Sequence, residues 1–288
     1  MKLKIAICQA FPKLGNFSHN IAEHSNFINS HKDCDLICFP ELSTTGYFVK
    51  DLAYDLAMTR DEFSEELNKK TSYKQKSMSI IAGFSERANG LIYNSLFVGS
   101  GDLSYSHRKI YPPTYGIFDE YRYFSCGEKI DPFLLKNNIS IGTLNCEDAW
   151  HQALPYIYSM YGIDLLVICA ASPVRGLFKN SEGTPWNVKL WQKLICSYAH
   201  LYGLYIVYVN RAGIEDGIHF SGYSCVVSPL GEIIEMLEPF KYDEKVIEID
   251  IKKARLEKAQ NCYLKEDDPF LTMRELQRAL EFRRENFK

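Results

Sequence analysis

The chain has 288 residues and a formal net charge of -3, with 33 Lys and Arg against 36 Asp and Glu. Hydrophobic residues make up 46% of the sequence and charged residues 24%, proportions typical of a folded globular protein that exclude a disordered chain. No run of like charges could follow a phosphate backbone, so we expect no nucleic-acid partner. No stretch reaches the roughly 18 apolar residues of a membrane helix, and the N-terminal apolar stretch is too short for a signal peptide.

The first part of the chain predicts a βαβ unit, with a strand at 3–9, a helix at 18–31 and a strand at 36–39. A segment with helical periodicity follows at 51–76. Two apolar runs, at 79–84 and 92–98, then predict a hairpin that turns through Asn89-Gly90.

The remainder of the chain alternates strand-like and helix-like segments. Further strands are predicted at 139–145, 164–170, 204–209, 222–227 and 245–250, and further helices at 148–161 and 184–202. Near-continuous apolar runs such as Leu165-Leu-Val-Ile-Cys169 are typical of strands that are covered on both faces. The pattern predicts a mixed α/β fold, with sheets layered against helices.

The absence of a linker predicts one domain over residues 1–255. Residues 256–288 are highly charged and contain an amphipathic segment near Phe270. We expect this segment to form a C-terminal arm that packs on the body or on a neighbouring subunit.

The nine cysteines are odd in number, lack CxxC pairs and often lie in apolar runs. We predict that most are reduced core residues, as in a cytoplasmic protein. Their positions are 8, 34, 38, 126, 146, 169, 196, 225 and 262.

Three segments carry residues suited to catalysis. Glu41 follows an apolar strand, where α/β folds place chemistry, and Lys109 ends the triplet His107-Arg108-Lys109. Cys146 ends a second apolar run, and a helix-like segment follows it. We expect the start of this helix to lower the pKa of the thiol and to offer an oxyanion site. Taken singly, residues such as Glu41 and Lys109 are more often surface residues, and a cysteine such as Cys146 is structural as often as it is catalytic.

Taken together, a strand-end Glu, a Lys in an HRK triplet and a strand-end Cys resemble the nitrilase, or carbon–nitrogen hydrolase, superfamily. Asn210-Arg-Ala-Gly213 and the segment 220–232 extend the resemblance to about residue 250. The resemblance implies a four-layer αββα sandwich. It also implies a homodimer or higher homo-oligomer, in which C-terminal arms reach across.

Within the superfamily, segments 115–124 and 146–150 are most similar to the glutamine-amidase domain of glutamine-dependent NAD synthetases. This similarity implies that Glu120 is a supporting second glutamate and that Tyr115 and Glu147 lie near a bound amide. One departure is that 288 residues leave no room for the ATP-using synthetase domain.

The segment Ser172-Pro-Val-Arg175 departs from the pattern too, because no basic residue stands where glutamine amidases bind the α-carboxylate of their substrate. Arg175 or Lys179 replaces it, or the substrate differs. We expect Ser172, Arg175 and Trp186 to border the substrate pocket.

The resemblance implies that Glu41 is the general base, that Cys146 is the nucleophile and that Lys109 and the Glu147 N–H stabilise the oxyanion. This chemistry needs no metal or organic cofactor, and the sequence contains no HExxH, Walker or dinucleotide-binding motif. We therefore expect a cytoplasmic hydrolase that releases ammonia from a small polar amide, either glutaminase-like or ω-amidase-like. An N-carbamoyl amidohydrolase, a nitrilase and a catalytically silent binding protein also remain compatible with the sequence.

Overall fold

The computed structural model describes residues 1–76, 78–135, 138–175 and 183–286. Two six-stranded sheets form its centre. The first contains, in spatial order, β14 (Asp243–Asp250), β1 (Lys2–Gln9), β2 (Leu36–Cys38), β3 (Ser79–Ala88), β4 (Leu91–Ser100) and β5 (Leu103–Arg108). The second contains β13 (Ile233–Met236), β12 (Cys225–Val227), β9 (Tyr205–Asn210), β8 (Leu165–Ala170), β7 (Ile139–Asn145) and β6 (Phe133–Leu135).

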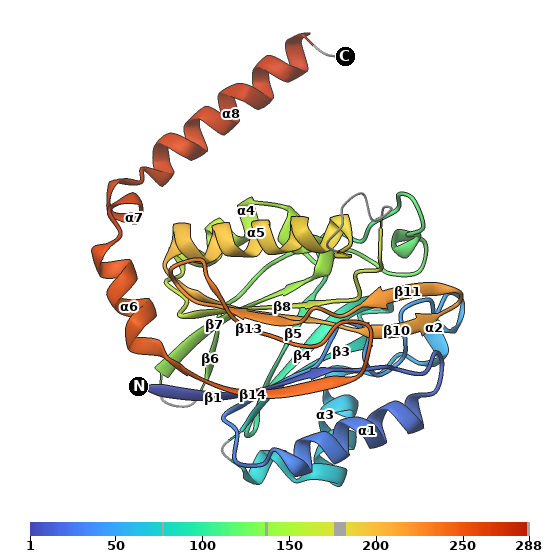
Figure 1. Ribbon diagram of the computed structural model, residues 1–288. Coiled ribbons are helices and arrows are strands. Elements are labelled where there is room, and N and C mark those ends of the chain that lie inside the picture. Colours follow the sequence, from blue (N-terminus) through green and yellow to red (C-terminus); the bar gives the residue numbers. More distant parts are fainter. Residues whose placement is uncertain (77, 136–137, 176–182, 287–288) are drawn as a thin grey trace.

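Helices cover the outer face of each sheet (Figure 1). The first sheet packs its outer apolar side chains against α1 (Phe17–Ser30) and α3 (Arg60–Thr71). The second sheet packs against α4 (Ala153–Met160) and α5 (Trp186–Tyr202). The chain therefore has four layers, and the αββα sandwich implied by the family resemblance is confirmed.

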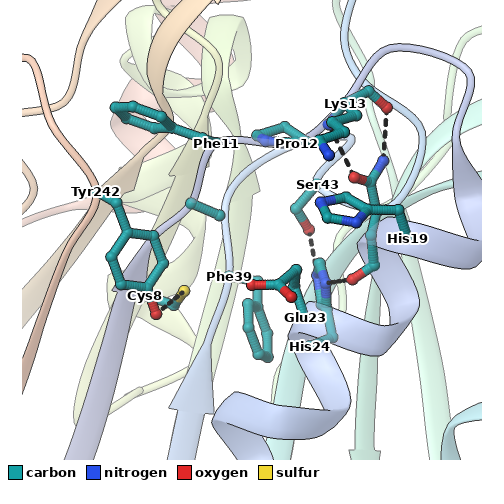
Figure 2. A pocket seen from close by; sticks show the side chains of 12 residues that line it. Cys8, Phe11, Pro12, Lys13, His19, Glu23, His24, Phe39, Ser43 and Tyr242 are labelled. Atoms are coloured by element: carbon teal, nitrogen blue, oxygen red, sulfur yellow. Dashed lines mark hydrogen bonds between the residues drawn. The ribbon is translucent and has the colours of Figure 1, made fainter.

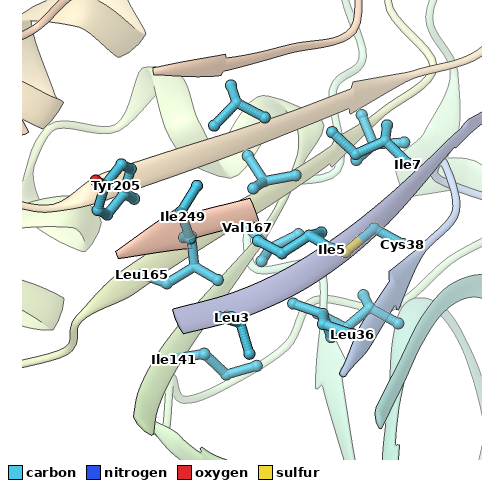
Figure 3. Packing of buried hydrophobic residues seen from close by; sticks show 14 of the residues in the cluster. Leu3, Ile5, Ile7, Leu36, Cys38, Ile141, Leu165, Val167, Tyr205 and Ile249 are labelled. Carbon is cyan, nitrogen blue, oxygen red and sulfur yellow. The ribbon is translucent and has the colours of Figure 1, made fainter. Parts of the chain in front are cut away.

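The inner faces of the two sheets enclose a shared hydrophobic core. Ile5 of β1 and Val167 of β8 are fully buried in it, and side chains of both sheets meet there (Figure 3). Because β8 is also covered by helices on its outer face, every residue in it is apolar. This double burial explains the continuous apolar runs of the sequence.

The direction of the strands determines where the loops gather. β1, β2 and β3 run parallel, as do β7, β8 and β9, so their carboxyl ends lie together within each sheet. β3 and β4 form the predicted hairpin, whose two turn residues Asn89 and Gly90 both have positive φ, at 52° and 76°. A two-residue turn of this kind matches the twist of the flanking strands.

Two predicted helices are broken in the structure. The segment 51–76 contains α2 (Leu52–Asp55), α3 and a 3-10 turn η1 (Tyr73–Gln75), because Thr59 and Glu62 form a capping box that starts a new helix. The segment 148–161 contains a 3-10 helix η4 (Cys146–Trp150) followed by α4.

Several strands were also missed or shortened. The strand predicted at 222–227 begins only at Cys225, after Tyr223, which has a φ of 57°. The strands missed from the sequence are β5, β6, β13 and the small hairpin of β10 (Ala212–Glu215) and β11 (Ile218–Ser221). Most of these strands are short or only partly buried, so they show neither the alternation of apolar and polar residues nor the apolar run that predicts a strand.

The C-terminal part begins with α6 (Ile251–Gln260), which belongs to the body, since Ile251 and Ala254 join the core and Arg255 pairs with Asp164 at 2.8 Å. α7 (Cys262–Glu266) and α8 (Pro269–Asn286) follow. Figure 1 shows α8 extending away from the sandwich, and none of its residues is buried. The arm over 256–288 stays a prediction.

Two further sequence expectations concern membrane helices and cysteines. None of the helices in the described ranges has the length and apolarity needed to cross a bilayer. The eight cysteines with described side chains are all unpaired, and six of them are buried.

Candidate active site

Glu41 lies in a tight loop after β2 and is completely buried. The loop passes so close to β3 that a Cβ atom on Gly83 would lie 2.1 Å from the backbone nitrogen of Leu42. Gly83 also donates its N–H to the carbonyl of Pro40 at 3.1 Å. Glycine is therefore required opposite this loop, and it allows the Glu41 carboxylate to enter the space between the sheets.

Lys109 follows β5 and is also fully buried. Its Nζ donates to Oε1 of Glu41 and to Oε1 of Glu120, each at 2.7 Å. One buried ammonium group thus lies between two buried carboxylates, so Lys109 is not a surface lysine.

The two carboxylates are held by further donors that the sequence analysis missed. Nδ2 of Asn94 donates to Oε1 of Glu41 at 2.7 Å and to Oε2 of Glu120 at 3.0 Å. The Tyr47 hydroxyl donates to Glu120 at 2.5 Å, and the N–H of Ala171, beyond β8, donates to Oε2 of Glu41 at 2.7 Å. Both glutamates are therefore fixed in position by neutral groups as well as by Lys109.

Cys146 follows β7 and opens η4 with only 9% of its surface exposed. Its φ of 51° lies in the left-handed region, which is unusual for a residue other than glycine and typical of strained functional turns. The thiol interacts electrostatically with Glu41, Lys109 and Glu120. The structure thus brings these four predicted site residues together.

The charges around Cys146 oppose its ionisation. Burial and the nearby Glu41 carboxylate raise the pKa of the Cys146 thiol well above its ordinary value, although Lys109 lowers it. The expectation of a lowered pKa was wrong, because burial of the thiol and the nearby carboxylates outweigh the effects of Lys109 and of the single short turn of η4.

The pKa values of the neighbouring groups follow from the same burial. Burial lowers the pKa of Lys109, but the carboxylates of Glu120 and Glu41 outweigh this effect, so the pKa lies well above its ordinary value. Burial also raises the pKa of Glu120. Lys109 is therefore a fixed positive charge.

Three of the predicted substrate-binding residues form a cluster near the thiol. The Tyr115 hydroxyl donates to Glu147 at 2.9 Å, and both residues interact electrostatically with Cys146. The guanidinium of Arg175 lies 5.2 Å from the Tyr115 ring centre and 4.4 Å from that of Phe118. Because Tyr115 is 50% exposed, a ligand can reach this cluster, which contains the carboxylate of Glu147 and the guanidinium of Arg175.

The remaining predicted pocket residues are placed differently. Ser172 is buried, accepts a hydrogen bond from Trp191 Nε1 at 2.9 Å and donates its N–H to Asn210 at 2.8 Å. Trp186 is the first residue of α5 and is 55% exposed. Lys179 lies outside the described residues.

A cavity of about 300 Å³ lies elsewhere, on the outer side of the first sheet beside α1 (Figure 2). It contains none of the predicted site residues, and Ser43, which is hydrogen-bonded to His24 at 2.9 Å, connects it to the loop of Glu41. Over the described ranges, no three His, Cys, Asp or Glu side chains are grouped as metal ligands. The predicted catalytic residues therefore lie outside this cavity.

The family model of carbon-nitrogen hydrolases matches residues 4–261 of the chain. The protein belongs to the carbon-nitrogen hydrolase family. It is accordingly an enzyme of that family, and the resemblance stated from the sequence is confirmed.

The relatives of this carbon-nitrogen hydrolase include both long and short proteins. The glutamine-dependent NAD(+) synthetase of Thermotoga maritima is 29% identical over 256 residues, which cover 87% of this chain and 42% of that protein. A probable nitrilase of Schizosaccharomyces pombe is 27% identical over 275 residues, covering 88% of this chain and 91% of that one. The chain thus spans less than half the length of the synthetase it matches.

A solved structure shares the same fold. The carbon-nitrogen hydrolase of Helicobacter pylori superimposes with a TM-score of 0.80 at 23% identity, covering 92% of this chain and 95% of that one. At this identity the similarity supports the sandwich architecture alone.

Proposed function

We propose that this carbon-nitrogen hydrolase cleaves the C–N bond of a small polar amide through a thioester on Cys146 and releases ammonia. The observation that carries the proposal is the buried Lys109 ammonium between Glu41 and Glu120, next to a strained cysteine. Burying three charged groups costs free energy, even when they pair with one another, so such an arrangement indicates a functional role. Perturbed groups that converge on a potential nucleophile are typical of an active site.

The reaction begins with the attack of Cys146 on the amide, which forms a tetrahedral intermediate. The Cys146 thiol stays protonated at rest, because its pKa is raised. Glu41 removes this proton as the sulfur attacks the substrate carbonyl carbon, and the carbonyl oxygen becomes an oxyanion. Lys109 and the N–H of Glu147 stabilise that oxyanion.

The following steps form the thioester, release ammonia and then restore the enzyme. Glu41 gives the proton to the substrate nitrogen, the C–N bond breaks, and ammonia leaves. Glu41 then takes a proton from water, whose oxygen attacks the thioester. The carboxylic acid departs, and the proton returns to the Cys146 sulfur.

The cluster at the entrance favours a polar substrate. Glu147 suits a substrate ammonium group, and Arg175 suits a carboxylate. An amino acid with a side-chain amide, as in glutaminase-like or ω-amidase-like hydrolysis, carries both. An N-carbamoyl amino acid carries the carboxylate alone and is the second candidate, since it would use Arg175 without Glu147.

A nitrilase and a catalytically silent binding protein have less support. A nitrile offers no charge for Glu147 or Arg175 to bind, and a silent binding protein has no use for a buried Glu–Lys–Glu arrangement. The assembly is part of the proposal too, as a homodimer or higher homo-oligomer with the arm 256–288 against a neighbouring subunit.

The test is ammonia release from a panel of glutamine, further ω-amides, N-carbamoyl amino acids and short nitriles. Cys146→Ala serves as the inactive blank, and Cys126→Ala, which removes an exposed thiol, as the matched control. Turnover of an amide by the wild type and Cys126→Ala alone supports the proposal. Ammonia together with carbon dioxide from the carbamoyl compounds favours the second candidate, and turnover by Cys146→Ala contradicts both.

A further inference from the structure

The nucleophile and the lysine reach the site from different sheets. Lys109 follows β5 of the first sheet, and Cys146 follows β7 of the second. Their relative position is therefore not set by neighbouring strands, and some contact across the two sheets has to fix it.

Asp148, two residues after the nucleophile, makes that contact. Its Oδ1 accepts the backbone N–H groups of Ile110 and Tyr111, each at 3.0 Å. These are the two residues that directly follow Lys109. Its Oδ2 accepts from His107 Nε2 at 2.8 Å, so three donors flank the lysine in the chain.

The same carboxylate also holds the turn of the nucleophile. Oδ2 of Asp148 accepts the backbone N–H of Asn145 at 3.3 Å, immediately before Cys146. Asp148 and His107 are both completely buried, so these hydrogen bonds act in a medium of low dielectric constant. The strained φ of Cys146 persists only if the surrounding structure enforces it, and one of the four hydrogen bonds that Asp148 accepts holds this turn, while the other three hold the segment of Lys109.

We propose that Asp148 is a positioning residue that sets the distance between the Cys146 sulfur and Lys109 by joining the two segments that carry them. The inference rests on the proposed function, because the positioning serves the attack of Cys146. A misplacement by about 1 Å costs on the order of 100-fold in rate, so a single lost restraint is measurable.

The test compares Asp148→Asn with Asp164→Asn. Asp164 is a matched control, because it is another buried aspartate that accepts from a backbone N–H, Ser140, and from a side chain, Arg255. It lies at the other end of β7 and β8, away from Cys146. In Asp148→Asn the new NH₂ group cannot accept from the N–H of Asn145, so that restraint is lost, and His107 keeps its contact only by moving its own proton to Nδ1, while Oδ1 keeps the remaining two bonds.

Two readouts are measured for both variants, together with the melting temperature. The first is turnover of the best amide, for which Asp148→Asn is expected to lower kcat about 100-fold with little change in KM, whereas Asp164→Asn leaves kcat unchanged. The second is the pH dependence of Cys146 modification by methyl methanethiosulfonate, followed on the Cys146 peptide. Asp148→Asn shifts this curve, because the sulfur moves relative to its charged neighbours, and Asp164→Asn does not.

The second readout needs no substrate. If the wild type hydrolyses none of the amides, the proposed function fails, and the modification curve still decides the positioning role. The inference is overturned if Asp148→Asn and Asp164→Asn lower the melting temperature alike and leave both readouts at their wild-type values. Should Asp148→Asn fail to fold, His107→Gln carries the same comparison with a single restraint altered.

Discussion

At the scale of single residues, the site is a balance of buried charges. Lys109 neutralises one carboxylate, while Glu41 and Glu120 supply two. The remaining negative charge is stabilised by the hydrogen bonds that Asn94 and Tyr47 donate to the carboxylates. In the proposed mechanism this excess of negative charge, together with burial, keeps the Cys146 thiol protonated until it attacks the substrate.

We expect Lys109→Met to abolish turnover and to lower the free energy of unfolding by about 3–5 kcal/mol, because two buried carboxylates lose their counter-ion. Urea denaturation measures the second effect. Lys2→Met is the control, since Lys2 pairs with Glu248 at the exposed surface and its loss should leave stability unchanged. A Lys109→Met protein as stable as the wild type would contradict the buried ion pairs.

The pH dependence of thiol modification tests the raised pKa of Cys146. Only the thiolate reacts, so the rate of modification by methyl methanethiosulfonate should still rise beyond pH 9.0, the value for an ordinary thiol. Glu120→Gln removes a negative charge, lowers the pKa of Cys146 and moves the curve to lower pH. A plateau in the wild type near neutral pH would show that the thiol ionises easily.

The residues named from the sequence and those missed differ in kind. Glu41, Lys109 and Cys146 could be predicted because each follows a strand and the three together match a family pattern. Asn94 could not, because a polar residue within a strand has no local signature until its backbone pairs with that of Lys109, just beyond β5. Asp148 was visible only as part of a motif, since its partners come from the other sheet.

At the scale of elements, the sequence predicts the strands and helices that are buried on a regular period. The central strands were recognised because both of their faces are apolar, and α1 and α5 because one face is. The pattern failed where local capping divides a helix, as at Thr59, and where a strand is short or lies at an edge, as for β6 and β13.

α1 carries a buried histidine that makes its attachment to the first sheet sensitive to acid. His24 is hydrogen-bonded to Ser43 and to the carbonyl of Asn20, and burial lowers its pKa to about 4. The unfolded chain binds a proton near pH 6.5, whereas the folded chain does not until about pH 4. Stability is therefore lost as the pH falls through this window, by up to about 3 kcal/mol.

We expect His24→Gln to remove this part of the acid sensitivity. Urea denaturation at pH 7 and at pH 4.5 should show a smaller difference for the variant than for the wild type, whatever its stability at pH 7. His219→Gln, at an exposed position, is the control and should keep the wild-type difference. Equal acid sensitivity in His24→Gln and the wild type would contradict a neutral buried His24.

At the scale of the whole molecule, α8 differs from the sandwich because none of its residues is buried. α6 is anchored by core residues and by the pair of Arg255 and Asp164, whereas α8 has no buried residue. Apolar side chains of α8 such as Phe270, Met273 and Leu276 are exposed, as expected for an arm that packs on a neighbouring subunit.

A chain ended after Asp268 should keep its fold and its amide turnover per site, because no core contact is removed. Light scattering should show a smaller assembly than that of the full chain if α8 packs on a neighbouring subunit. Circular dichroism checks the fold of the shortened chain. An unchanged assembly would contradict the predicted role of the arm, and loss of the fold would contradict its independence from the core.

The division of the site between two sheets also has a consequence for how activity arises during folding. Glu41 and Lys109 are carried by one sheet and Cys146 by the other, so in the proposed mechanism a partly folded chain keeps the general base and the nucleophile apart. Such a chain cannot attack amides that it meets before it is complete. The rate at which turnover recovers after dilution from urea should therefore report how fast the two sheets pack together during folding.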